Sequence, residues 1–511
     1  MFCAAGAQNL AQLRRRGTLW QETSVKFLFD TNIIIPLEPQ VAPTDGAIAP
    51  AAMELLRLIQ QSGSQVLVHE LISDDIQRDR QEERKRWTSV VLAKYPVLSP
   101  YPGIAPEQKL LIGDAPRGSN AWVDDHLLTA VARDAVDYLV TEDRGMHRKA
   151  ARLAIGERVL FVIDALTIVR GLFPAFSPTP PAVARVPLHS LDASDPIFDG
   201  FRSDYLGTFD AWLSNAKRLD RPAWVVWGDS HRIAALCIIK EETSGEFGLR
   251  GKVLKICTFK VADQYHGFRF GELLLKPVFR YLVDNKYDRV FVTSFEKHVH
   301  LVAMFADFGF RTLEERTSLG ELVLERSVGP QGDDVDLGPA EFCLRFSPLF
   351  PSWKGTVWLV PIRPVFEAIL FPERQTQGDF FGGTHPFGNG IRKAYLCHSG
   401  TTSLAAGDVL AFYRSVDTQA VVSLGTVDSV MRSEVSNEIT RFVARRTVYT
   451  ASQIDHMCLE GAVLAIQFRQ LLRDFEPIPG KELKKKGIST PQSLARLTPE
   501  ALPWFRQRTG T

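Results

Sequence analysis

The chain has 511 residues, 45% of them hydrophobic, and its 60 basic and 59 acidic side chains leave a net charge of +1. At about 150 residues per domain this length predicts roughly three domains, and the balanced charge neither requires nor excludes a nucleic-acid partner. No apolar run reaches the roughly 20 residues of a membrane span. The six cysteines are too far apart in sequence for a zinc motif or a disulfide framework, so a cytoplasmic location is expected.

Two stretches rich in proline, glycine and polar residues, 173–196 and 327–342, are predicted to be linkers. Proline removes a backbone donor and fixes φ, so such stretches are not expected to hold a helix or a central strand. They divide the chain into blocks at 22–172, 190–328 and 340–511, and the expected fold class is α/β multidomain.

In the first block, apolar runs alternate with segments of helical spacing. VKFLFDTNIIIPL begins with a strand, QVLVHELISDDIQ is a strand that leads into a helix, DHLLTAVARDA is a helix, and YLVTED is a short strand. Alternating strands and helices favour a parallel sheet that is covered by helices on both faces.

Acidic side chains follow these apolar elements. Asp30 and Asp143 each end a predicted buried strand, where open parallel sheets form their binding sites, and Asp75, Asp124 and Asp125 lie at the starts of predicted helices. Carboxylates gathered at one edge raise each other's pKa, and a divalent cation removes that cost. Mg²⁺ and Mn²⁺ prefer carboxylate and water oxygens and activate water for phosphodiester hydrolysis. Taken singly, each aspartate fits a helix N-cap or a turn equally well.

Two of these segments resemble PIN-domain ribonucleases. FLFDTNIIIPL is similar to the opening strand of that family, and DHLLTAVARDAVDYLVTEDRGM to its closing motif, in which a helix and a strand separate two acidic residues. The resemblance covers the first block and implies cleavage of RNA. It also implies the following ligands for Mg²⁺ or Mn²⁺: Asp30, Asp125 and Asp143, with Asp124 as the alternate to Asp125.

The same resemblance assigns roles to neighbouring residues. Asp75 would position or deprotonate the water, with Glu70 as the fallback, although the family usually has glutamate at this place. Thr31 and Asn32 would orient Asp30 and contact a metal-bound water or a phosphate. Many members of the family are toxins, so the resemblance further implies an antitoxin-like partner protein and a homodimer.

The sequence pattern of the second block predicts mixed α/β structure. A hairpin with its turn at 228–230 is followed by the strand VLKICTFKVAD, the helix GELLLKPVFRYLVDN, the strand RVFVTSF and the helix HLVAMFADFGF. RGKVLKICTFKVADQYHGFRFGELLL resembles the core of GNAT-type acyltransferases, in which a glycine-rich loop before a helix binds the pyrophosphate of coenzyme A. The resemblance assigns acetyl-CoA to Gly267, Arg269 and Gly271. Arg269 replaces a usual glycine, and Phe305 stands where a tyrosine acid is common.

The third block contains short β runs, including TVWLVPIRPVFEAIL, KAYLCHSG and DVLAFYRS, and predicts a small β-barrel with flanking helices. It resembles PUA-like domains of the ASCH or EVE type, which implies RNA binding rather than catalysis. The candidate contacts are Arg363, Lys393, Tyr413 and Arg414, although core packing explains Tyr413 equally well. KELKKKG at 481–487 is a basic run that is either a solvated loop or a phosphate contact.

The leading hypothesis is therefore a metal-dependent ribonuclease, toxin-like or related to defence, whose C-terminal block selects the RNA. Two alternatives remain open. The middle block could transfer an acetyl group from acetyl-CoA to RNA or protein, or the chain could be a non-catalytic RNA-binding protein on degenerate folds.

Overall fold

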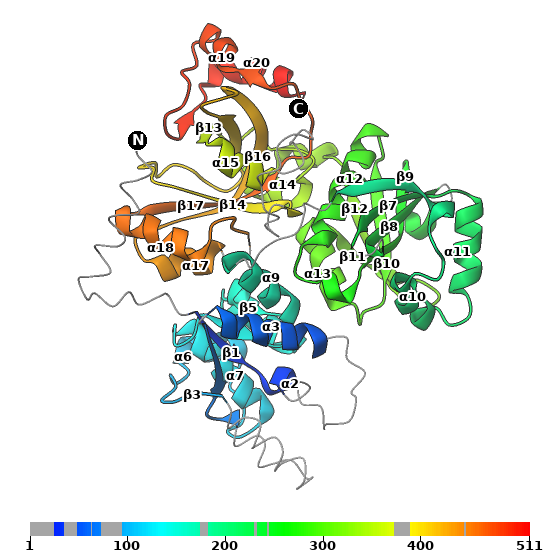
Figure 1. The fold of residues 1–511 in the computed structure, drawn as a ribbon, viewed down its shortest axis with the longest axis vertical. Helices are drawn as coiled ribbons and strands as arrows, with labels where there is room; N and C mark the ends of the chain where they lie inside the picture. Colours follow the sequence, from blue (N-terminus) through cyan, green and yellow to red (C-terminus); the bar gives the residue numbers. More distant parts are fainter. Residues whose placement is uncertain are drawn as a thin grey trace.

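The computed structural model describes residues 25–34, 49–62, 64–72, 95–173, 182–228, 232–242, 245–371, 389–443 and 446–510. These residues form one parallel sheet and two mixed sheets, each with its own helices, and the sheets follow one another along the chain (Figure 1). Among the described residues, no helix has both the length and the apolar character needed to span a bilayer. Asp75 lies outside the described residues.

The first sheet is parallel throughout and has the strand order β3-β2-β1-β4-β5. Its elements are β1 (Lys26–Phe29), α2 (Thr31–Ile34), α3 (Ala49–Gln61), β2 (Gln65–His69), β3 (Val97–Leu98), α6 (Pro106–Ile112), α7 (Asn120–Ala132), β4 (Tyr138–Val140), α8 (Arg144–Arg152), β5 (Val159–Leu160) and α9 (Val162–Leu172).

Alternating side chains of β1 place helices on both faces of this sheet. Phe27 and Phe29 pack with α3 and α9, whereas Leu28 packs with α7 and α8. The predicted parallel sheet with two helical layers is therefore confirmed. Its strand order reverses between β1 and β4, and the crevice at such a point is where open parallel sheets bind ligands.

The second sheet has the order β11-β12-β10-β9-β8-β7-β6. Its elements are β6 (Val183–Pro187), α10 (Asp199–Asp204), α11 (Phe209–Arg218), β7 (Pro222–Trp227), β8 (Ile233–Glu242), β9 (Val253–Val261), α12 (Phe270–Asp284), β10 (Arg289–Ser294), α13 (Val299–Asp307), β11 (Arg311–Arg316) and β12 (Leu322–Ser327). Only β9 and β10 are parallel neighbours among these strands. The predicted antiparallel pairing of β7 with β8 and both predicted helices are confirmed, whereas residues 229 and 230 of the predicted turn lie outside the described residues.

The predicted linker at 173–196 is wrong in part, because β6 lies within it and pairs with β7. Strand β6 forms an edge of its sheet, where a proline such as Pro187 costs no central hydrogen bond. The second sheet therefore begins at Val183 rather than after residue 190. The second predicted linker, 327–342, likewise contains a short 3-10 helix (Gly332–Asp336) and the start of α14 (Pro339–Phe346).

The third sheet is mixed and strongly curved, with the order β14-β17-β16-β15-β13-β19 and β18 paired to β16. Its elements are β13 (Val357–Ile362), α15 (Pro364–Leu370), β14 (Arg392–Cys397), β15 (Val409–Arg414), β16 (Ala420–Ser433), α17 (Ser436–Val443), α18 (Ala451–Glu460), β17 (Val463–Gln470), β18 (Ile478–Pro479), α19 (Gly480–Lys485), β19 (Ala495–Arg496) and α20 (Leu502–Thr509). Aromatic rings from three strands and the end of α15 meet inside the curve: Phe371, Tyr395, Phe412 and Phe468.

Candidate functional site

The carboxyl ends of β1 and β4 bring two of the predicted acidic residues to one edge of the first sheet. The amide of Asp30 donates to the Val140 carbonyl at 3.1 Å, which ties the residue after β1 to the last residue of β4. Asp143 follows β4 by three residues, and its carboxylate accepts a hydrogen bond from the Met146 amide at 2.9 Å, so it caps α8. Asp143 therefore caps α8 and also lies at this edge of the sheet.

Thr141 links the side chains at this edge. Its hydroxyl donates to Asp30 Oδ2 at 2.7 Å and accepts from the Asn32 amide group at 3.2 Å and the Asp143 backbone amide at 3.1 Å. The Thr31 hydroxyl donates to the other oxygen of Asp30 at 3.2 Å. Thr31 and the backbone of Asn32 therefore contact Asp30 directly, and the Asn32 side chain reaches it through Thr141, whose role was missed. Its position directly after a buried strand was the available signal. The expected contact of Thr31 and Asn32 with a metal-bound water or a phosphate stays a prediction.

The structure distinguishes the two aspartates of α7. Asp125 is buried and forms an ion pair with Lys149 Nζ at 2.5 Å. Burial raises the pKa of Asp125, and the hydrogen bond and charge of Lys149 oppose that rise. Among the described residues, Asp124 forms no ion pair within 4.0 Å. Burial, together with the charges of Asp30 and Asp143, raises the pKa of Asp124 to about 7. The charges of Asp30 and Asp143 act on Asp124, whereas those of Lys149, His126 and Arg152 act on Asp125, so we infer that Asp124 is the one of the two that faces the edge.

Burial also raises the pKa of Asp30, although the hydrogen bonds from Thr141 and Thr31 oppose that rise. Two carboxyls with raised pKa values beside a third carboxylate form an edge that favours a proton or a cation. Glu70, the fallback for Asp75, is exposed directly after β2.

The donor set suits a hard divalent cation, because Mg²⁺ is commonly held by one or two carboxylates and keeps several waters. Among the described residues, however, no three His, Cys, Asp or Glu side chains are grouped so as to hold a metal ion. The fit therefore rests on Asp30 and Asp124, with waters completing the coordination.

The middle block contacts the same edge. Arg144, at the start of α8, donates to the Glu296 carbonyl at 2.6 Å, and His300 of α13 lies 3.5 Å from the Glu142 carboxylate. Phe161 contacts the His300 ring with centroids 4.6 Å apart. Segments 296–300 and 141–144 are therefore neighbours.

The loop assigned to acetyl-CoA lies between the blocks. Gly267 and Arg269 have positive φ values of 82° and 58°, as a tight turn before α12 requires. A Cβ on Gly267 would lie 3.1 Å from Leu166 of α9, and a Cβ on Gly271 would lie 2.7 Å from the sulfur of Met304. The chain itself therefore packs closely against the two glycines.

The four predicted RNA contacts of the third block lie in different environments. Tyr413 is buried with its hydroxyl close to Gly480, which confirms the core-packing explanation, and Lys393 is fully buried with its ammonium 5.8 Å from the centre of the Phe371 ring. Arg414 forms ion pairs with Glu367 and Asp417. Only Arg363 among the four is exposed. The prediction that the other three contact RNA at the surface is corrected, because they are buried or paired with carboxylates.

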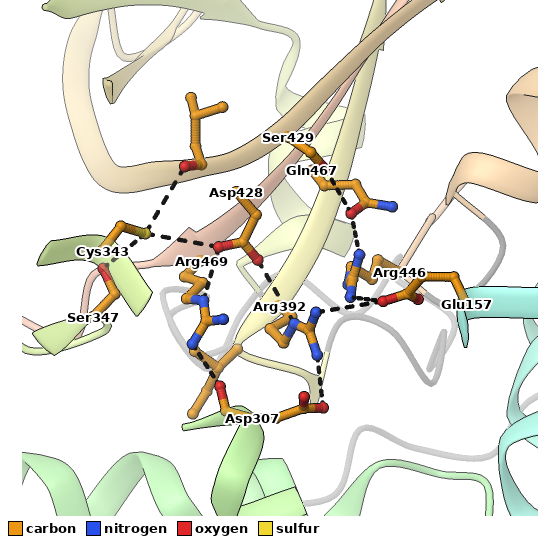
Figure 2. Close-up of polar contacts among 12 residues, drawn as sticks. Glu157, Asp307, Cys343, Ser347, Arg392, Asp428, Ser429, Arg446, Gln467 and Arg469 are labelled. Carbon is orange, nitrogen blue, oxygen red and sulfur yellow. Dashed lines mark hydrogen bonds and ion pairs between the residues drawn. The ribbon is translucent and has the colours of Figure 1, made fainter. Parts of the chain in front are cut away.

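A cavity of about 280 Å³ lies on the outer face of the third sheet, next to the other two blocks (Figure 2). Its walls include Glu157 of the first block and Arg392, Asp428, Phe442 and Arg469 of the third. Side chains at alternate positions of β14 and β17 share this outer face, because Arg392 pairs with Arg469 in the antiparallel register.

Ion pairs around this cavity join all three blocks. Arg392 lies 2.7 Å from Asp307 of the middle block, 3.6 Å from Asp428 and 3.9 Å from Glu157 of the first block. Burial alone would lower the pKa of Arg392, but these carboxylates raise it above its ordinary value. Arg446 pairs with Glu157 at 3.2 Å, and Arg469 pairs with Asp428. The three arginines of this cluster therefore balance its three carboxylates.

No protein-family model and no curated protein matches the chain. Solved structures that are similar to parts of it include the ASCH protein from Zymomonas mobilis, at 16% identity over 30% of this chain and 95% of that one, with a TM-score of 0.23. A GNAT-family acetyltransferase from Staphylococcus aureus matches at 12% identity over 29% of this chain and 100% of that one, with a TM-score of 0.24. A GNAT-family acetyltransferase from Listeria monocytogenes matches at 16% identity over 30% of this chain and 99% of that one, also with a TM-score of 0.24. At these TM-scores the likenesses decide nothing about function.

Proposed function

We propose that the first block hydrolyses RNA with a divalent cation held at the carboxyl edge of its parallel sheet. The observation that supports this most is the place of Asp30 and Asp143, which follow the two strands between which the strand order reverses. Their charges, together with burial, raise the pKa of Asp124 to about 7. A helix N-cap needs one carboxylate, not three that repel each other, so capping alone does not account for the cluster.

In this proposal the side chains at the edge have separate tasks. Asp30 and Asp124 hold Mg²⁺ or Mn²⁺, and the Thr141 and Thr31 hydroxyls fix the two oxygens of Asp30. When bound, the cation supplies an acidified water and neutralises charge on the phosphodiester. Asp143 is exposed and lies on the open side of the edge, where it accepts a proton or orients water.

We further propose that the third block binds the RNA through the surface of α19, here called the α19 basic surface and defined as Lys481, Lys484, Lys485 and Lys486. All four lysines are exposed, and Lys486 Nζ lies 5.8 Å from the centre of the half-buried Trp504 ring. Lysines beside an aromatic ring suit a single strand, because phosphates meet the charges and bases stack. This surface replaces the buried Tyr413 and Lys393 as the candidate contact.

The test is cleavage of labelled single-stranded RNA and total tRNA with Mg²⁺ or Mn²⁺. The Asp30→Asn, Asp124→Asn double variant should lose at least about 100-fold in rate, more than residues that only support a metal ligand. Asp114→Asn is the matched control, because Asp114 is exposed and forms an ion pair with Lys109 away from the acidic edge. Cleavage by the double variant at the control's rate would contradict the proposal.

A further inference from the structure

The segment 266–272, here called the loop 266–272, includes the residues before α12 and the start of its first turn, at the place that the acyltransferase resemblance assigns to a pyrophosphate. A pyrophosphate there would need exposed backbone amides at the helix N-terminus and room for the ligand. Four residues of this segment, Gly267, Phe270, Gly271 and Glu272, are instead buried, and the contacts that cover it come from both neighbouring blocks.

The first block covers one side of this loop. Arg170 of α9 donates to the His266 carbonyl at 2.5 Å, and its guanidinium carbon lies 4.1 Å from the centre of the Phe268 ring. Arg170 is also paired with Glu54 of α3 at 3.6 Å, so two helices of the first sheet hold it in place. The contact combines a hydrogen bond, a cation–π interaction and the close packing of Leu166 against Gly267.

The third block covers the other side. Asn389 donates to the Phe268 carbonyl at 3.1 Å, and the backbone amides of Ile391 and Arg392 donate to Glu272 Oε2 at 2.6 and 3.1 Å. Arg269 is paired with the other oxygen of Glu272. The segment that leads into β14 is therefore anchored on the first turn of α12.

Glu272 fills the electrostatic role that an anionic ligand would have. It is buried in the first turn of the 15-residue helix α12, where a negative charge is stabilised by the helix dipole. A pyrophosphate at the same helix end would meet a like charge at short range, which disfavours it. In addition, Phe305 is fully buried among Phe259 and Phe310, so this position presents no acid to a substrate.

We infer that the loop 266–272 is the joint that fixes the first and third blocks onto the middle block, and that it does not bind coenzyme A. The middle block is thus an adaptor that uses its helix N-terminus to hold the chain's own glutamate. This inference does not depend on the proposed hydrolysis of RNA, and a failure of either leaves the other standing.

Two measurements on the full-length protein test the inference. Calorimetric titration with acetyl-CoA should give no binding stronger than a Kd of about 1 mM. Hydrogen exchange should show that Glu272→Gln speeds the exchange of the Ile391 and Arg392 amides by about tenfold or more, because a charge-assisted bond becomes a neutral one. Glu500→Gln, a change at an exposed glutamate, should leave that exchange unaltered.

Two results would overturn the inference. One is micromolar binding of acetyl-CoA that protects residues 266–272 from exchange. The other is unchanged exchange at Ile391 and Arg392 in folded Glu272→Gln. If that variant does not fold, the titration of the unmodified protein still decides the question, and Arg170→Ala tests the opposite side of the joint by exchange at the loop.

Discussion

At the scale of single residues, the buried hydroxyl of Thr141 organises the acidic edge. It donates one hydrogen bond and accepts two, so both lone pairs and the proton are used. Because the proton goes to Asp30, the hydroxyl stabilises the charged form of that carboxyl against the effect of burial. A residue with no acid–base chemistry of its own thereby sets the charge and orientation of its neighbour.

Replacing Thr141 with valine keeps the shape and removes all three bonds. We expect the free energy of unfolding to fall by about 1–3 kcal/mol, because buried partners are left unsatisfied. Thr129→Val is the control, since the buried Thr129 hydroxyl donates to the Asp125 carbonyl within its own helix. If urea unfolding gave equal losses of unfolding free energy for the two variants, the hydrogen bonds of Thr141 would not be special to this edge.

Asp124 makes the edge sensitive to pH. Its pKa is raised to about 7 in the folded protein, so its contribution to stability is full below the ordinary value of 3.8 and is lost as the pH rises through about 7. Without divalent cations, the unmodified protein should therefore lose melting temperature relative to Asp124→Asn as the pH is raised from about 5.5 to about 8. At the higher pH, Mg²⁺ should restore the melting temperature that the unmodified protein has lost relative to Asp124→Asn. Parallel curves for the two proteins would show that Asp124 titrates normally.

At the scale of elements, Arg326 of β12 joins two helix ends. It is almost fully buried, and its guanidinium donates to the Phe308 carbonyl after α13 and to the Phe346 and Ser347 carbonyls at the end of α14. Burial, together with the positive charge of Arg469, lowers the pKa of Arg326 to about 9. Carbonyls at helix C-termini supply the compensating negative potential.

Arg326→Met should lower the free energy of unfolding by about 1–3 kcal/mol, because the carbonyls lose their donor while the volume is roughly kept. Arg316→Met on exposed β11 is the control and should stay within about 0.5 kcal/mol. Thermal and urea unfolding give both values. A neutral or stabilising effect of Arg326→Met would mean that the cost of burying the charge exceeds the value of its hydrogen bonds.

The α19 basic surface carries the prediction for RNA binding. Replacing Lys484, Lys485 and Lys486 with glutamate should weaken binding of single-stranded RNA and reduce the slope of log affinity against log salt by about 2, since each lost phosphate contact on a single strand contributes about 0.7. Fluorescence anisotropy at several salt concentrations measures the slope. An unchanged slope would place the RNA elsewhere on the molecule.

Periodicity predicted the elements that bury a regular face. The strand at Lys26–Phe29, the helices α12 and α13 and the β7–β8 hairpin follow from alternating or helical spacing of apolar residues. Strand β6 was missed because its prolines argued against a strand, and only the pairing with β7 shows that it lies at an edge. Likewise, spacing could not decide between Asp124 and Asp125, because adjacent helix positions point in different directions and the partner Lys149 is 24 positions away.

At the scale of the whole molecule, charged contacts around the outer-face cavity join the three blocks, as Figure 2 shows. Arg392, Asp307 and Glu157 come from three different blocks, and Arg441 of α17 adds pairs with Asp134 and Asp137 of the first block. Sequence patterns within one block carry no information about such contacts, which explains why neither this cluster nor the joint at residues 266–272 was predicted. These contacts place the third sheet against the block that carries the acidic edge.

The central claim is that Asp30 and Asp124 form a cation site, and calorimetric titration with Mn²⁺ tests it most directly. We predict one binding event at about pH 8 for the unmodified protein, the same event for Asp114→Asn, and none for the Asp30→Asn, Asp124→Asn double variant. Asp125→Asn should keep the event, because Asp125 is paired with Lys149. Equal binding by the double variant, or loss of binding in Asp125→Asn alone, would contradict the site described here.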